Sequence, residues 1–481
     1  MKLLKATERH PLCIDLDGTL IKTDSLTESI LSLVGKNPIY LFILPFWLFS
    51  GLAKFKLKVA RHVDLDVARL PYSQKVLDMI ANHRLEGRPI VLATASPYPV
   101  AEKIAEHLGV FSMILASDEN TNLKSRAKAR LLVEKFGKKG FDYVGNSKDD
   151  LPVWALAQRS YLINCSQKVR KRADRLQTDV EILRLKKPLV RLLAKQIRVH
   201  QWAKNILIFA PMILAQNFLD PFSWLSCIHA FIAFSFVSSS VYIVNDVLDL
   251  ESDRAHQENK FRPFASGDLS LFWAGVLFPF LLGSGIILSI LLSWQFFAVI
   301  ASYFALTSAY SFRLKQMPIA DIIVLASLYS WRVFAGSVAS GVALSEWFLT
   351  FSTFFFLSLA LVKRCSELIV TQQNNKKSNK RRGYQVNDLP LLVSLGVASG
   401  YLSILVLALY MNAPGDRSIS YNPQLLWAMI PFMLFWISRT WLLAHRGLMP
   451  SDPLVFAMKD RVSYLLFAIV SFLWLFGNGL I

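Results

Sequence analysis

The chain has 481 residues, of which 53% are hydrophobic and 12% aromatic, so an entirely soluble enzyme and a disordered chain are excluded. The formal net charge is +19, and the first 203 residues carry 34 of the 53 basic side chains. Four scattered cysteines without a CxxC spacing exclude a disulfide scaffold. The composition therefore indicates a basic, soluble-like front part followed by a membrane part.

Residues 1–165 are predicted to form an α/β domain with a doubly wound parallel sheet. Helical stretches separate the expected strands, which are Leu12–Asp17, Pro89–Thr94, Met113–Ala116, Asp142–Gly145 and Ser160–Asn164. Active sites in such sheets lie at the carboxyl ends of the strands. Because residues 1–20 lack the apolar core of a cleavable signal, we expect a cytoplasmic N-terminus.

An insertion at about residues 24–71 contains a segment that fits neither part. Pro38–Ala53 (PIYLFILPFWLFSGLA) is uncharged, short for a membrane span and interrupted by Pro45, and lysines follow it. We expect an amphipathic, membrane-facing lid that lies in the interface. A buried cap helix and a re-entrant or spanning segment remain as alternatives.

Residues 166–203 are predicted to be a basic connector, with eleven basic and three acidic side chains. Each basic residue contributes about 1 kcal/mol near anionic headgroups, so this stretch is expected to hold the front domain at the membrane surface. A solvated linker is the alternative.

Residues 204–481 are predicted to form nine transmembrane helices, each long enough for a hydrocarbon layer of about 30 Å. The apolar stretches are 204–219, 222–244, 271–292, 294–312, 320–340, 346–362, 388–411, 424–444 and 462–480. With the N-terminus inside, the inward loops carry fifteen Lys and Arg residues and the outward loops only Arg417. We therefore expect a multi-pass protein of a bacterial inner (plasma) membrane.

The first predicted strand ends in Asp15-Leu16-Asp17-Gly18-Thr19, which places two carboxylates beside a turn. Such a pair suits Mg²⁺ and phosphoryl transfer, which needs a nucleophile, a proton carrier and a cation. With the strand end Leu92-Ala93-Thr94, Lys124 and the run Gly145–Asp150 (GNSKDD), the sequence resembles the haloacid dehalogenase (HAD) phosphatase superfamily over about residues 10–165.

The HAD resemblance implies a role for each motif residue. Asp15 would be the nucleophile and Asp17 the general acid/base. The implied phosphoryl-binding residues are Thr94, Ser96 and Lys124, and the implied Mg²⁺ ligands are Asp15, Asp17, Asp149 and Asp150. Asn146 stands where the superfamily has an aspartate in GDxxxD, so an inactive HAD scaffold is the alternative.

A second acidic motif, NDVLDLESD, occupies residues 245–253 after the second predicted helix. Asn245, Asp249 and Asp253 recur at intervals of four and would share one helix face. A row of acids at a membrane end requires cations, so we expect Mg²⁺-diphosphate to bind there. A solvated loop helix is the alternative.

The motif NDxxDxxxD resembles the UbiA superfamily of intramembrane prenyltransferases over residues 198–481. The single acid Asp321, Arg332 in SWRVFAG and the run RVHQWAKN at 198–205 are more similar to its polyprenyl-phosphate phosphoribosyltransferase branch. The resemblance implies catalytic Asp246, Asp249 and Asp253, and Mg²⁺ on Asn245, Asp249 and Asp253. The implied substrate-binding residues are Lys204, Tyr242, Lys260, Arg262, Asp321, Arg332, Lys363 and Arg364.

The expected fold is thus a Rossmann-like α/β HAD domain followed by an all-α, nine-helix UbiA-type bundle. The expected enzyme transfers 5-phosphoribose from phosphoribosyl diphosphate to polyprenyl (decaprenyl) phosphate, and the HAD domain then removes the 5-phosphate to give polyprenylphosphoryl ribose for cell-wall arabinan synthesis. The alternatives are prenyl transfer to an aromatic or other acceptor, a dead HAD scaffold, and a transporter. Mg²⁺ is the expected cofactor and the lipid membrane a partner; no nucleic acid is expected, and a homo-oligomer is left open.

Overall fold

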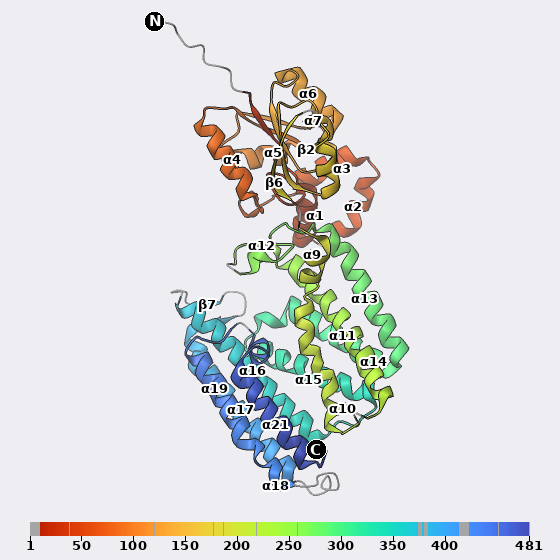
Figure 1. Cartoon of the computed structure of the whole chain (residues 1–481), viewed down its shortest axis with the longest axis vertical. Coiled ribbons are helices and arrows are strands. Elements are labelled where there is room, and N and C mark those ends of the chain that lie inside the picture. The colour runs from red at the N-terminus through yellow and green to blue at the C-terminus, as the bar shows by residue number, and fades with distance from the viewer. Residues whose placement is uncertain are drawn as a thin grey trace. The chain divides into compact units, whose positions relative to one another are not determined.

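A computed structural model of the chain divides into two compact units, Met1–Arg198 with Tyr242–Phe278, and Val199–Val241 with Pro279–Ile481 (Figure 1). The structure describes residues 10–37, 39–118, 121–176, 178–185, 187–217, 219–256, 258–373, 378–379, 383–412, 423–450 and 452–480. Pro38 and Arg417, used in the sequence analysis, lie outside these ranges.

The first unit contains a six-stranded parallel sheet with the order β3-β2-β1-β4-β5-β6. Its strands are β1 (Leu12–Ile14), β2 (Ile90–Pro97), β3 (Met113–Ser117), β4 (Asp142–Gly145), β5 (Arg159–Cys165) and β6 (Asp179–Leu185). The doubly wound sheet expected from the sequence is confirmed, but β6 falls within the predicted basic connector. The sheet therefore extends beyond residue 165, and part of that stretch is an edge strand and not a linker.

Alternation along the central strands buries both faces of this sheet. Leu12 and Ile14 of β1 pack in one hydrophobic cluster, whereas Cys13 between them packs in the other. The accompanying helices are α1 (Ser25–Lys36), α2 (Tyr40–Leu48), α3 (Leu52–His62), η1 (Val67–Arg69), α4 (Gln74–Leu85), α5 (Tyr98–Leu108), α6 (Arg126–Phe136), η2 (Lys148–Asp150), α7 (Leu151–Trp154), α8 (Gln167–Ala173) and α9 (Leu189–Gln196). The first three form the insertion after β1.

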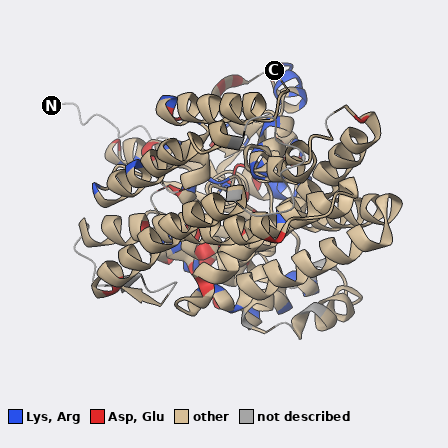
Figure 2. Cartoon of the chain, turned by 90° about the horizontal axis from the view of Figure 1, so that it is seen from below, with Lys and Arg blue, Asp and Glu red and all other residues tan. Residues whose placement is uncertain are grey.

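The second unit is helical. Most of the chain's ribbon in Figure 2 is tan, which marks residues other than Lys, Arg, Asp and Glu. The helices of the second unit begin with η3 (Val199–Phe209), α10 (Ala210–Leu214), α11 (Pro221–Leu248), α13 (Phe272–Leu292), α14 (Trp294–Phe312), η5 (Leu314–Gln316) and α15 (Ala320–Ser340). They continue with α16 (Glu346–Gln373), η6 (Val386–Asp388), α17 (Leu389–Asn412), α18 (Pro423–Leu426), α19 (Met429–His445), α20 (Pro453–Ala457) and α21 (Arg461–Gly477). Between α11 and α13, helices α12 (Leu250–Arg254) and η4 (Asn259–Phe261) belong to the first unit.

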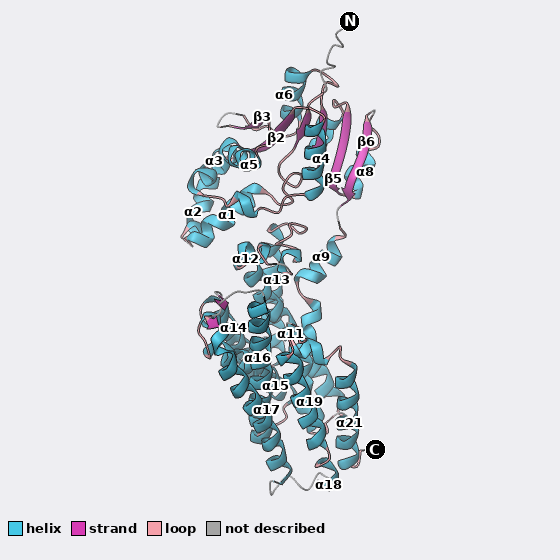
Figure 3. Cartoon of the chain, turned by 90° about the vertical axis from the view of Figure 1, so that its left-hand side faces the viewer, coloured by secondary structure: helices cyan, strands magenta, loops and turns pink. Residues whose placement is uncertain are grey.

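The described part of the second unit contains two short strands, β7 (Ser378–Asn379) and β8 (Tyr384–Gln385), which pair with each other (Figure 3). Within the described ranges, six helices are long and apolar enough to cross a membrane. The predicted count of nine is not confirmed. The first predicted span is the 3₁₀ stretch η3 with the five-residue α10, α16 contains Lys363 and Arg364, and α21 has only 17 residues. The chain is a multi-pass membrane protein with an α/β front unit.

Candidate active sites

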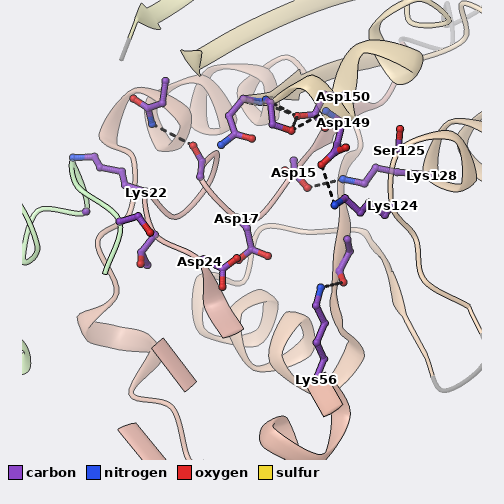
Figure 4. A pocket seen from close by; sticks show the side chains of 18 of the residues that line it. Asp15, Asp17, Lys22, Asp24, Lys56, Lys124, Ser125, Lys128, Asp149 and Asp150 are labelled. Carbon is purple, nitrogen blue, oxygen red and sulfur yellow. Dashed lines mark hydrogen bonds and ion pairs between the residues drawn. The ribbon is translucent and has the colours of Figure 1, made fainter. Parts of the chain in front are cut away.

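The first candidate site lies at the carboxyl end of β1, where Asp15 directly follows the strand. The backbone N–H of Asp15 donates to the carbonyl of Val144 on β4, which fixes the residue between the two central strands. Nζ of Lys128, on α6, lies 2.6 Å from Oδ1 of Asp15, and both side chains are largely buried (Figure 4). Burial raises the pKa of Asp15 to about 7, although Lys128 opposes the rise.

Asp17 is held by the start of α1 and by β2. Its Oδ1 accepts a hydrogen bond from the backbone N–H of Ser25 at 2.7 Å, and its Oδ2 accepts one from Oγ of Ser96 at 2.5 Å. Burial raises the pKa of Asp17, Asp24 adds to the rise, and the two serine hydrogen bonds oppose it. A carboxyl group with a raised pKa can carry a proton closer to neutral pH, as a general acid must.

Two lysines near these carboxylates have different partners. Lys124, the predicted cation, pairs with Asp149 at 3.2 Å, and its side chain is 58% exposed. Lys128 contacts Asp15 and also donates to the hydroxyl of Tyr143 at 2.9 Å. The cation beside the predicted nucleophile is therefore Lys128, which the sequence analysis missed. A signal was available in the sequence, because Lys128 is a second lysine four residues after Lys124. The structure places it in the first turn of α6.

Asp150 is bound to its own loop. Its Oδ2 accepts the backbone N–H groups of Asn146 at 3.0 Å and Ser147 at 2.9 Å, and its Oδ1 accepts the Tyr143 hydroxyl at 2.9 Å. Asn146 lies against the DxDGT turn, since a Cβ on Gly18, where φ is +73°, would be 1.8 Å from Asn146 Nδ2. The amide thus occupies the side of the loop that faces Gly18.

The two predicted phosphoryl donors on β2 have other roles. Thr94 is fully buried, and its Oγ1 accepts the backbone N–H of Ser96. The Ser96 hydroxyl is engaged with Asp17. Among the described residues that line the pocket, Ala95 is present and Thr94 and Ser96 are not. The structure therefore does not place either hydroxyl at the pocket wall.

A pocket of about 380 Å³ joins these groups, which is a volume typical of small-molecule sites. Five lysines line it together with the carboxylates, namely Lys22, Lys56, Lys124, Lys128 and Lys187. Gly267, Asp268 and Ser270, from the segment before α13, also contribute to the wall. Nζ of Lys187 lies 2.6 Å from Oδ2 of Asp268. The pocket thus combines lysines with carboxylates, and its lysines suit the oxygens of an anionic ligand such as a phosphate ester.

The second candidate site begins at the end of α11. The backbone N–H of Asp249 donates to the carbonyl of Asn245, and that of Asp253 donates to Asp249, both at 2.8 Å. Helical hydrogen bonding thus continues from α11 across Asp249 into α12, and the common face of the three side chains stays a prediction. Oδ1 of Asn245 is buried and has no hydrogen-bond partner among the described residues. This oxygen is a candidate ligand for a cation.

Three cationic or amide side chains surround the buried carboxylate of Asp246. Nε2 of Gln196 lies 2.8 Å from its Oδ2, Arg198 contacts its Oδ1, and Nη1 of Arg262 lies 3.1 Å from the same Oδ1. Arg262 also lies 2.5 Å from Oδ2 of Asp253, so it bridges two acids of the motif. The sequence analysis included Arg262 but did not assign Gln196 or Arg198 to the site.

Two further predicted residues lie around this cluster. The ring of Tyr242 lies 4.8 Å from the guanidinium carbon of Arg198, which is within cation–π range. Lys260 is exposed, and its Nζ lies 5.2 Å from the ring centre of Phe261. The structure therefore ties Tyr242 to the acid cluster through Arg198 and gives no such link for Lys260.

In the second unit, two predicted substrate-binding residues bind each other. Nε of Arg364 lies 2.5 Å from Oδ2 of Asp321, and its Nη2 lies 2.9 Å from Oδ1, with both side chains fully buried. Lys363 precedes this arginine on α16 and is partly buried. Lys204, another predicted substrate-binding residue, forms an ion pair with the carboxylate of Asp452.

Arg332 differs from these cations because its hydrogen-bond partners are neutral. Its Nε donates to Oδ1 of Asn205 at 2.9 Å, and its Nη2 donates to the hydroxyl of Tyr303 at 3.2 Å. The guanidinium also lies 5.2 Å from the ring centre of Phe234 and 5.6 Å from that of Tyr329. Its Nη1 donates to the carbonyl of Leu328, so within the described part of the chain the hydrogen bonds of this buried guanidinium all go to uncharged groups.

Residues 206–458 match the UbiA prenyltransferase family, and residues 12–154 match the haloacid dehalogenase-like hydrolases. The chain belongs to the UbiA prenyltransferase family. The predicted fusion of a HAD-like region to a UbiA region is thereby confirmed, and the chain is an enzyme that combines a membrane transferase with a HAD phosphatase domain. Both families are generally Mg²⁺-dependent.

Relatives of this UbiA protein cover different parts of it. It is 37% identical over 464 residues to the uncharacterized protein y4nM of Sinorhizobium fredii, which covers 96% of this chain and 90% of the relative. It is 34% identical to the nodulation protein NoeC of Azorhizobium caulinodans, over 55% of this chain and 86% of the relative. It is 31% identical to a decaprenyl-phosphate phosphoribosyltransferase of Mycolicibacterium smegmatis, over 58% of this chain and 90% of the relative.

The donors present in the UbiA motif fit a metal that brings its own phosphate ligands. Across the described ranges, no group of three or more His, Cys, Asp or Glu side chains is arranged to enclose a metal ion. Mg²⁺ usually binds one or two carboxylates together with waters and substrate phosphates. The unpartnered Oδ1 of Asn245 and the carboxylates of Asp249 and Asp253 match that pattern.

Proposed function

We propose that the UbiA region is a polyprenyl-phosphate phosphoribosyltransferase and that the HAD region dephosphorylates its product. The observation that carries the proposal is the helical row of Asn245, Asp249 and Asp253, in which the buried Asn245 oxygen has no partner among the described residues. Such a row suits a Mg²⁺-bound diphosphate. The similarity to decaprenyl-phosphate phosphoribosyltransferases supports this choice of reaction.

The environment of Asp321 supports phosphoribosyl diphosphate over a prenyl diphosphate as the donor. It is the single acid of the stretch 310–321, where the superfamily usually has a second aspartate-rich motif. Both of its carboxylate oxygens accept from the buried Arg364, so Asp321 is already paired with a cation of the chain itself. Arg332, held by neutral groups, is then a candidate to bind the additional phosphate of a phosphoribosyl donor.

In the first step, an oxygen of the polyprenyl phosphate attacks C1 of the ribose, and the C1–O bond to diphosphate breaks. Mg²⁺, when bound, neutralises charge on the leaving diphosphate. The lipid phosphate is already anionic, so the step requires no strong general base. Arg262, which contacts Asp246 and Asp253, adds positive charge beside the acid motif. The product is a polyprenylphosphoryl 5-phosphoribose.

In the second step, the carboxylate of Asp15 attacks the phosphorus of the 5-phosphate, and the ester P–O bond breaks. Asp17 donates a proton to the departing ribose oxygen, which its raised pKa favours. Lys128 stabilises charge beside Asp15. Water then hydrolyses the aspartyl phosphate, with Asp17 accepting the proton, and polyprenylphosphoryl ribose and phosphate result. We place this chemistry at the cytoplasmic face of a bacterial inner membrane, where the product would serve cell-wall arabinan synthesis.

The proposed transfer is tested with the purified full chain, Mg²⁺, polyprenyl phosphate and labelled phosphoribosyl diphosphate. Asp249→Ala and Asp253→Ala are expected to abolish labelled lipid formation, because each removes a charged ligand of the diphosphate site. The matched control is Glu251→Ala, since Glu251 lies on the same short helix but its side chain is 61% exposed. Full activity in both aspartate variants would refute the metal assignment.

A thermal-shift measurement separates the two donor classes. Phosphoribosyl diphosphate with Mg²⁺ is expected to stabilise the chain, because a ligand that binds only the folded state raises its unfolding temperature. Geranyl diphosphate is the comparison ligand. Stabilisation by geranyl diphosphate alone would favour prenyl transfer to an aromatic or other acceptor.

A further inference from the structure

The insertion after β1, formed by α1, α2 and α3 and called the cap below, presents an apolar face that the proposed chemistry does not use. Helix α2 contains no charged residue. On this helix and its two ends, Ile39, Phe42, Phe46 and Phe49 are 60%, 77%, 74% and 88% exposed. Their spacings of three, four and three residues place them in one stripe along the helix. Three exposed phenylalanines in a row are unusual on a surface that meets only water.

Aromatic contacts hold the other side of α2 against α3. The ring centres of Tyr40 and Trp47 are 5.9 Å apart, and those of Trp47 and His62 are 4.8 Å apart. Phe55 and Val59 anchor α3 in turn, because both are buried. The phenylalanine stripe is therefore presented outward by a supported pair of helices.

The charges around the stripe are of one sign. No acidic residue occurs between Glu28 and Asp64 in the sequence, whereas Lys54, Lys58 and Arg61 on α3 are exposed. An apolar stripe beside exposed cations is complementary to a bilayer with anionic headgroups. Because the same chain crosses a membrane, a bilayer is always available to it.

The cap also reaches the pocket of the HAD-like region. Lys56 lies on α3 between the exposed lysines, lines the pocket, and its Nζ lies 3.4 Å from the carbonyl oxygen of Ala95 on β2. Asp24, which caps α1, lines the pocket as well. The helices that present the phenylalanines therefore also form part of the pocket rim.

We propose that α2 is a membrane-docking helix, whose stripe of Ile39, Phe42, Phe46 and Phe49 inserts into the interface of an anionic bilayer. Docking brings the rim of the HAD pocket to phosphate esters carried on lipids, and it does not act on soluble esters. The identity of that lipid-linked ester rests on the proposed function, whereas the docking itself does not.

Docking is tested on the full chain in proteoliposomes that contain phosphatidylglycerol. Phe46→Cys is labelled with an environment-sensitive fluorophore, and the matched control is Leu85→Cys, because Leu85 on α4 is 89% exposed and lies outside the cap. The four native cysteines are buried, so the unsubstituted chain measures background labelling. We expect a blue-shifted signal at position 46 that lipid-borne quenchers reduce and aqueous iodide does not, with the reverse at position 85.

Two other results would overturn the docking helix. Quenching by iodide at position 46 would place the stripe in water. Protection from both quenchers would place it against protein, including a second copy of the chain. Neither readout requires catalysis, so a failure of docking is distinguishable from a failure of the proposed function.

A second arm measures the consequence for activity. Replacing Phe42, Phe46 and Phe49 together by Ser should lower the rate on a lipid-linked 5-phosphate in bilayers by at least about tenfold, because each exposed Phe contributes about that factor to membrane partition. The rate on a soluble phosphate ester should not change. Equal losses on both esters, or no loss on either, would refute a delivery role for α2.

Discussion

Nζ of Lys128 lies 2.6 Å from Oδ1 of Asp15, while Lys124, four residues earlier, pairs with Asp149 near the surface. The two lysines therefore form a matched pair for mutation. Lys128→Ala should reduce phosphatase turnover by roughly 10²- to 10³-fold, because a buried charge beside the nucleophile stabilises the transition state. Lys124→Ala should have a much smaller effect, since exposed ion pairs contribute little. Steady-state kinetics on the lipid ester show which lysine is the catalytic cation. A larger loss of turnover for Lys124→Ala would restore Lys124 to that role, as predicted from the sequence.

The buried ion pair between Arg254 and Glu28 should contribute to the stability of the first unit. Nη2 of Arg254 lies 2.5 Å from Oε1 of Glu28, and the two side chains are 8% and 4% exposed. Glu28→Gln should lower the free energy of unfolding by about 3–5 kcal/mol, because it leaves a buried arginine uncompensated. Labelling of the buried Cys13 and Cys165 during heating measures this unfolding.

The control for that pair is Asp64→Asn, which breaks the exposed Lys103–Asp64 contact with side chains 47% and 84% exposed. Its effect should stay below about 1 kcal/mol. If Glu28→Gln and Asp64→Asn unfold at the same temperature, the buried pair does not stabilise the unit.

Arg332 and Arg364 should respond differently to substitution, although the sequence analysis assigned both to phosphate binding. Arg332→Lys should leave the folded yield intact and lower transferase activity by at least about tenfold, because lysine cannot reproduce the planar, multidentate contacts of arginine. Arg364→Ala should lower the folded yield, because Asp321 would remain buried without its partner. Size-exclusion profiles and labelled-lipid assays separate the two effects, and a well-folded, inactive Arg364→Ala would return that residue to the substrate site.

Asn146 provides a test of metal affinity in the HAD region. It lies against Gly18, and an amide supplies no charge to a cation. Asn146→Asp should therefore lower the Mg²⁺ concentration needed for half-maximal phosphatase activity, because a carboxylate attracts the ion more strongly. A Mg²⁺ titration of both forms measures the shift. An unchanged midpoint would mean that this side chain does not contact the metal.

Local patterns predicted the architecture because they were strong. The strand ending in Asp15 and the acid row from Asn245 to Asp253 each have a clear period and follow an apolar element, so their place in the fold follows from the sequence. The edge strand β6 was missed because Asp179–Leu185 contains three charged residues and pairs on one side only. Because of these charges, the stretch was predicted to belong to a basic connector and not to a strand.

The partners of individual cations could not be read from the sequence. The pairs Arg364–Asp321 and Lys204–Asp452 join residues 43 and 248 positions apart, and only packing of distant helices brings them together. The choice between Lys124 and Lys128 depends on where α6 begins, and helix boundaries are the least certain part of a sequence prediction. The span predicted at 346–362 was too short for a similar reason, because α16 continues past Lys363 and Arg364 to Gln373.

The central claim, that one chain makes a phosphorylated lipid-linked sugar and then removes its 5-phosphate, is tested most directly by comparing the lipid products of wild type and Asp15→Asn. Both are incubated with Mg²⁺, polyprenyl phosphate and phosphoribosyl diphosphate labelled in the ribose, and the lipids are analysed by mass spectrometry. Wild type should yield polyprenylphosphoryl ribose, whereas Asp15→Asn should accumulate the 5-phosphate form, because the nucleophile is lost while the acid row of the UbiA region is unchanged. If both forms yield the same lipid with the 5-phosphate still attached, the HAD region is not the phosphatase of this product and the two-step account is wrong.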